Sequence, residues 1–166
     1  MPKAVVKVAE GARFRTEFEM LRGGVGSIDI DYATECSAGA TAEMVARISG
    51  RGEDRIRVHE KAELNGERSR AVLKTRIAVR DAARAEVVNE IVARAAGARG
   101  HVDCKEIVQD RGVARAVPIV EVLHPLAHVT HEAAVGSVDS LQLQTLLARG
   151  LSEDEAVETI IEGLLA

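Results

Sequence analysis

Residues 69–80 read Ser-Arg-Ala-Val-Leu-Lys-Thr-Arg-Ile-Ala-Val-Arg, and they form the most regular stretch of the chain. Small or apolar side chains such as Ala71, Leu73 and Ile77 occupy every second position, whereas Arg70 and Lys74 lie between them. Successive side chains of a β-strand point to opposite faces. A period of two therefore predicts a strand with one face in the core and the other in solvent.

The same alternation continues in both directions, from Ala12 to about Val135. Glycine or charged pairs separate the alternating stretches, so that one strand follows another roughly every 12 to 15 residues. The further stretches lie at 14–20, 28–32, 42–48, 55–64, 85–93 and 102–108. We therefore predict a mainly β body built from many short, similar strands.

The aromatic residues narrow the choice of β architecture. Phe14, Phe18 and Tyr32 are the whole inventory, and all three lie near the N-terminus. The rest of the core must consist of Val, Ile, Leu and Ala, which suit thin, stacked layers better than a wide sandwich core. Periodicity alone does not separate a sandwich from a solenoid, but this composition favours a β-helix.

Length and charge restrict the classes of partner. A chain of 166 residues fits one domain, and a formal charge of −4 with interspersed signs gives no electrostatic footprint for nucleic acid or an anionic membrane. We see no long apolar run and no leader-like start, and expect a cytoplasmic protein. Cys36 and Cys104 have neither the spacing of a disulfide framework nor that of a zinc site.

After Val135 the pattern changes from strand to helix. Asp139 or Ser140 can cap a first helix that ends before Gly150. The stretch Ser152–Glu155 is a capping box for a second helix, whose apolar residues repeat at helical spacing to about residue 164. We therefore divide the chain into a β body, 1–136, and a C-terminal helical hairpin, 137–166, packed as one compact unit.

Several blocks in this C-terminal region resemble, in order, the signature of the SufB/SufD family. They are Pro118-Ile-Val-Glu-Val122, His131-Glu-Ala-Ala-Val-Gly-Ser-Val-Asp139, Leu141-Gln-Leu143, Ala148-Arg-Gly-Leu-Ser-Glu-Asp-Glu-Ala156 and Ile160-Ile-Glu-Gly-Leu164. The resemblance implies a right-handed parallel β-helix followed by helices. It also implies a non-enzymatic scaffold subunit of the SUF system, which binds a SufC-like ABC ATPase and holds a nascent iron–sulfur cluster.

The resemblance points to three candidate cluster ligands. His131 and Glu132 match the family's His-Glu step, and Cys104 is the thiol nearest to them in sequence. A strand places His131 and Glu132 on opposite faces, so the two could chelate one ion only across a bulge. His131 could equally be a core histidine and Cys104 a core filler. We expect a transient iron–sulfur cluster, no permanently bound cofactor and no certain metal site.

The resemblance also suggests two partner surfaces. The hairpin carries more apolar positions than it can bury against itself, and we expect Leu141, Leu146, Leu147 and Leu151 to contact the ATPase. The strand at 113–122 is the candidate for dimerisation with an identical copy or a SufB/SufD-like sister subunit.

Two rival functions stay open. SufB-like sequences have a cysteine where this chain has Gly112, so a SufD-like structural partner that ligates no iron is one alternative. A carbohydrate-active β-helix enzyme is the other, but the aromatic sugar platforms and clustered acids that it needs are not apparent in the sequence.

Overall fold

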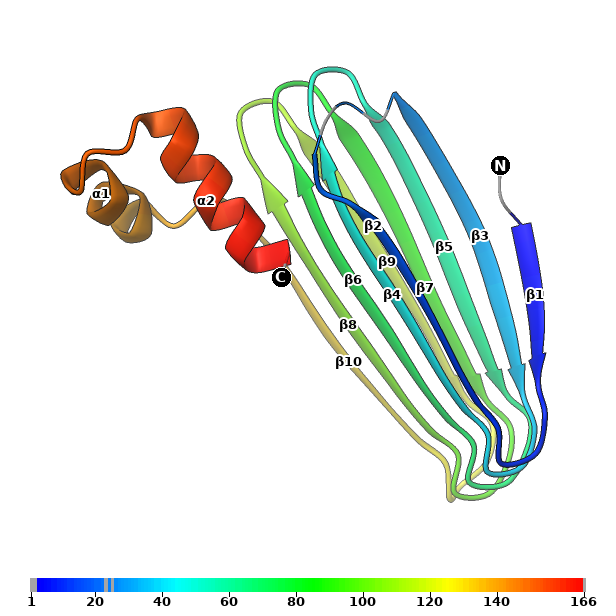
Figure 1. The fold of residues 1–166 in the computed structure, drawn as a ribbon. Coiled ribbons are helices and arrows are strands. Elements are labelled where there is room, and N and C mark those ends of the chain that lie inside the picture. Colours follow the sequence, from blue (N-terminus) through cyan, green and yellow to red (C-terminus); the bar gives the residue numbers. More distant parts are fainter. Residues whose placement is uncertain (1–2, 23, 25, 166) are drawn as a thin grey trace.

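The computed structural model describes residues 3–22, 24 and 26–165. These residues form ten strands and two helices, and the strands wind into a parallel β-helix (Figure 1). The predicted fold class is thus confirmed: a β-solenoid followed by a helical pair. None of the helices in the described part of the chain is both long and apolar enough to span a bilayer.

The strands have nearly uniform length, and the helices follow the last of them. The elements are β1 Lys3–Val8, β2 Arg13–Met20, β3 Ser27–Cys36, β4 Thr41–Gly50, β5 Arg55–Leu64, β6 Arg70–Val79, β7 Arg84–Ala93, β8 Arg99–Val108, β9 Val113–Val122, β10 His128–Gly136, α1 Ser140–Ala148 and α2 Glu153–Leu165. β1 lies outside the region of predicted alternation, which begins at Ala12.

Successive strands belong to opposite sheets. The odd sheet has the order β1-β3-β5-β7-β9, and the even sheet has the order β10-β8-β6-β4-β2. Lys3 pairs with Asp31, 28 positions later, and Arg55 pairs with Arg84, 29 positions later. One coil is therefore two strands and two turns, and the spacing of 12 to 15 residues seen in the sequence is half of a coil.

The space between the two sheets is filled by the apolar half of each strand. On β6, Ala71, Leu73, Ile77 and Val79 are buried in the main core, whereas Arg70 is exposed, as the alternation predicted. Parallel pairing places equivalent positions of successive coils side by side, so inward residues form rows along the solenoid axis. Small and branched side chains suit such narrow rows.

The turns stack as closely as the strands. Gly39 N–H donates to the Glu67 carbonyl at 2.8 Å, and Arg68 N–H donates to the Ala96 carbonyl at 2.9 Å, which continues the ladder through the turns. A Cβ built on Gly66 would lie 2.0 Å from the backbone nitrogen of Ala38, so only glycine permits this approach of two turns.

α2 packs on the outer face of the even sheet, and α1 lies beyond it (Figure 1). Val157, Ile161 and Leu165 of α2 form a second apolar cluster with Ala78 of β6 and Ile107 of β8. The ends of the helices follow the sequence rules. The Asp139 side chain accepts from Gln142 N–H at 2.8 Å, and Ser152 and Glu155 form the expected capping box.

Ion pairs tie α2 to the ends of three strands of the even sheet. Glu158 bonds Arg51 at 2.8 Å and Arg80 at 2.7 Å, and Glu162 lies 3.4 Å from Arg22. These arginines follow β4, β6 and β2, so one helix contacts three successive coils.

Candidate functional site

The last two strands of the even sheet bring two of the predicted ligands onto one face. Cys104 of β8 pairs with Ala133 of β10, and Val102 pairs with His131. Cys104 is buried between the sheets, so both Ala133 and His131 face the interior. His131 and Cys104 are therefore diagonal neighbours, with Cβ atoms roughly 7–8 Å apart. His131 is nevertheless exposed, because β10 is the end of its sheet.

Glu132 lies on the opposite face, as the alternation predicted. Its carboxylate is 3.4 Å from the Lys105 ammonium group on the outside of the even sheet. Glu132 and His131 do not converge, and β10 pairs with β8 over all nine of its residues without an interruption in register. Of the two residues that match the family's His-Glu step, His131 therefore faces the interior and Glu132 faces outward.

Glu106 is an inner residue that the sequence analysis did not single out as a site. The Cys104 thiol donates to Glu106 Oε1 at 3.0 Å, and Glu106 Oε2 is buried without a hydrogen-bond partner among the described residues. Glu106 is 2% exposed, and burial raises the pKa of its carboxyl group. The signal was available: residue 106 occupies an inward position of an alternating strand, where a carboxylate is costly.

The Cys104 thiol is held in its protonated form. Burial raises the pKa of Cys104 far above its ordinary value, and the carboxylates of Glu106 and Glu60 add to this effect. A thiol with a raised pKa is a weak nucleophile and becomes a metal ligand only when a cation replaces its proton.

A second polar group lies deeper between the sheets. Glu60 of β5 is paired in register with Asn89 of β7, and Asn89 Nδ2 donates to Glu60 Oε2 at 3.1 Å. The Thr75 hydroxyl, from the facing sheet, lies 3.4 Å from the same oxygen and 3.3 Å from Asn89 Oδ1. Burial raises the pKa of Glu60 to about 7. The interior thus holds two carboxyl groups whose ionisation is disfavoured by their surroundings.

The described residues contain no group of three or more His, Cys, Asp or Glu side chains arranged to hold a metal ion. A cleft of about 590 Å³ opens at the C-terminal end of β10, next to α2. Glu106, Val135, Asp139 and Ile160 are among its lining residues. Glu106 therefore lies at the boundary between the solenoid interior and the helices.

The sequence of the chain matches a known protein family. The family described as "SUF system FeS cluster assembly, SufBD core domain" matches residues 4–164, which is nearly the whole chain. The chain belongs to the SufBD family. The resemblance seen in the C-terminal blocks therefore extends over the strands as well, including β1.

Individual relatives support this assignment. An iron-sulfur cluster assembly SufBD family protein of Methanocaldococcus jannaschii is 37% identical over 164 residues, 99% of this chain and 52% of that protein. One from Pyrococcus horikoshii is 34% identical over 163 residues, 98% of this chain and 50% of that protein. The iron-sulfur cluster assembly protein SufB of Bacillus subtilis is 36% identical over 73 residues, 43% of this chain and 16% of SufB. The chain thus spans about half the length of the archaeal relatives.

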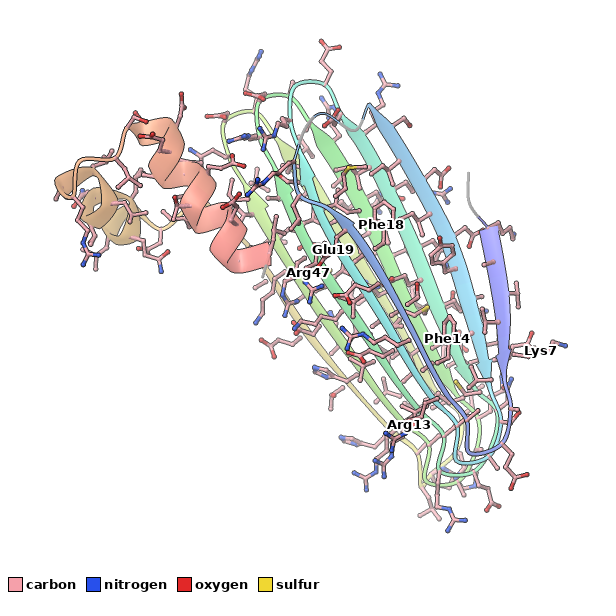
Figure 2. All side chains as sticks on the ribbon, in the orientation of Figure 1. Lys7, Arg13, Phe14, Phe18, Glu19 and Arg47 are labelled. Carbon is pink, nitrogen blue, oxygen red and sulfur yellow. The ribbon has the colours of Figure 1, made fainter. Side chains whose placement is uncertain are left out.

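The two ends of this SufBD core differ in how the interior is closed. At the N-terminal end, Phe14 and Phe18 of β2 pack against the core (Figure 2). At the C-terminal end the inward positions of β10 hold His131, Ala133 and Val135, and Val135 is 57% exposed. Large exposed apolar residues gather in this part of the chain: Val113, Ile119, Val120, Val122, Leu123, Leu126 and Val135.

The helical surface of this SufBD core is divided between its two helices. None of the residues of α1 is buried; Leu141 is 71% exposed and Leu147 is 38% exposed. Leu146 and Leu151, the other predicted partner contacts, are half-buried. α2 instead has four buried residues, so it belongs to the folded body while α1 is presented to solvent. The hairpin as a whole is not one free surface.

Proposed function

We propose that the chain is a cytoplasmic, non-enzymatic scaffold subunit of SUF-type iron–sulfur cluster assembly. The observation that carries the proposal is the combination of a thiol, a carboxylate and an imidazole on the inner face of β8 and β10, in a member of the SufBD family. These three groups are chemically suited to iron, since thiolate and imidazole nitrogen are its common ligands in clusters and carboxylate is a substitute.

In this proposal Cys104 and Glu106 act as a unit. When ferrous iron approaches, the Cys104 thiol transfers its proton to the Glu106 carboxylate or to solvent, and the cation stabilises the resulting thiolate. His131, exposed at the open end, offers a neutral nitrogen on the same face. The cluster is cargo in this scheme, held until a recipient protein takes it.

Two partner surfaces complete the proposal. The edge strands β9 and β10, with the exposed apolar residues around them, would pair with a second copy or with a SufB/SufD-like sister subunit. Leu141 and Leu147 of α1 would contact a SufC-like ATPase, because large exposed leucines on a helix that has no buried residue favour burial against another protein.

A SufD-like structural partner that ligates no iron is the second candidate. The specific observation in its favour is the burial of Cys104, which raises the pKa of its thiol and so disfavours the thiolate. In that case Cys104 fills the core, Glu106 accepts its hydrogen bond, and the subunit contributes only its interfaces.

Anaerobic reconstitution with ferrous iron and sulfide distinguishes the two candidates. Iron content and visible absorption are measured for wild type, Cys104→Ala and His131→Ala. Cys36→Ala is the matched control, because Cys36 is the other fully buried cysteine and lies in β3. The scaffold function predicts that the first two variants lose iron while the control keeps it. Equal iron content in all four proteins would favour the structural partner.

A further inference from the structure

A row that includes three arginines and one histidine crosses the outer face of the even sheet at its first strand position. Arg13, Thr41, Arg70, Arg99 and His128 are paired in register across all five strands. The three arginines and the histidine are exposed. Arg13 marks one end of the row in Figure 2. Neighbouring strands are about 4.8 Å apart, so the row is about 19 Å long.

The arginines of this row lack the carboxylate partners that most other cations of the face have. In the described part of the chain, no ion pair or side-chain hydrogen bond joins Arg13, Arg70 or Arg99 to an acidic group. Farther along the strands, Lys74 is in register with Asp103. The remaining cations of the face have direct partners: Arg15–Glu43, Arg47–Glu19, Arg76–Asp103 and Lys105–Glu132.

Arg70 and Arg99 are in register on adjacent strands, so their like charges repel one another. A guanidinium group presents a fork of N–H donors that matches a carboxylate. An external anion that lies along the row would supply the missing partners.

We propose that the row Arg13–Arg70–Arg99–His128 is a docking surface for an extended acidic segment of a partner protein. The row is narrow. Glu43 lies two residues after Thr41 on β4, and Glu17, Asp103 and Glu132 lie four residues after the row on their own strands. A broad polyanion such as a nucleic-acid duplex would cover these carboxylates and be repelled. An extended peptide covers about 19 Å with roughly six residues and can follow the row alone.

The test uses the full chain and fluorescein-labelled octaglutamate in a fluorescence anisotropy titration at low and at physiological salt. Two exposed arginine–carboxylate contacts correspond to a change in Kd of about three- to thirtyfold. We expect R70Q/R99Q to weaken binding by that factor, and the difference to shrink at higher salt.

The matched control is R55Q/R84Q. Arg55 and Arg84 occupy the same first strand position on the odd sheet, also without an ion pair in the described structure, but Ser27 and Val113 flank them. This control should change Kd less than about twofold, since two arginines make no extended row.

Four results would overturn the proposal: no octaglutamate binding up to about 1 mM, equal loss in both double variants, tighter binding of an eight-residue oligothymidylate than of octaglutamate, or a melting temperature of R70Q/R99Q more than about 5 °C below that of the control. The last result would indicate that the row stabilises the strands and does not serve as a docking surface.

Discussion

Replacing the buried Glu60 carboxyl by an amide should stabilise the protein above neutral pH. Burial raises the pKa of Glu60 from 4.5 to about 7, so the native state holds this proton more tightly than the unfolded chain does. The contribution of Glu60 to stability is therefore greatest below about pH 4.5, falls as pH rises to about 7, and is level above that. The difference of about 2.5 pKa units corresponds to about 3 kcal/mol at pH 8.

Glu60→Gln keeps the shape of the side chain and removes the charge. The amide oxygen can still accept from Asn89 Nδ2, but its NH₂ group must find new acceptors near Thr75, which costs about 1 kcal/mol. The expected gain at pH 8 is therefore about 2 kcal/mol, whereas at pH 4.5, where the Glu60 carboxyl group of the native protein is protonated, the cost of the amide leaves the variant no more stable than wild type. Glu106 titrates in the same direction, so part of the pH dependence stays in the variant.

Urea unfolding followed by circular dichroism between pH 4.5 and 8 measures this effect. Glu53→Gln is the control, because Glu53 is exposed in the turn after β4. A Glu60→Gln variant that is no more stable than wild type at pH 8, and that keeps the full pH slope, would refute the reasoning that Glu60 ionises at a cost inside the solenoid.

Two further outcomes are expected. Gly66→Ala should destabilise the fold by about 1–3 kcal/mol in the same urea assay, because its Cβ would meet the Ala38 backbone, whereas Gly136→Ala, which has open space, should change stability by less than about 0.5 kcal/mol. Leu147→Asp should weaken capture of a SufC-like ATPase at least about tenfold in a pull-down while Gln144→Asp on the same helix does not; equal capture by both would remove α1 from the interface.

The sequence predicted those features that depend on neighbours along the chain. The inward face of residues 69–80, the Asp139 cap and the Ser152–Glu155 box all follow from spacings of a few residues, and the structure confirms them. The repeat of 28 or 29 residues was not predicted. It relates positions on successive coils, and the side chains at such positions need only be similar in size.

The candidate site was only partly visible in the sequence for the same reason. That Cys104 and His131 share a face depends on the register of β8 against β10, which no local pattern specifies. Glu60 and Glu106 were not predicted as site residues, because alternation shows which face of a strand a residue occupies but not which polar groups lie beside it across the core.

The ion pairs of α2 with Arg22, Arg51 and Arg80 affect how order is lost in the stack. Where each coil touches only the next, opening spreads from an end one coil at a time. Because α2 forms ion pairs with three coils at once, those coils are expected to open together. β9 and β10, which lie beyond them, can fray alone. A partner protein that binds the helices and moves α2 away from the sheet would destabilise coils that it does not itself contact. Binding at the helices could therefore open the interior between the sheets.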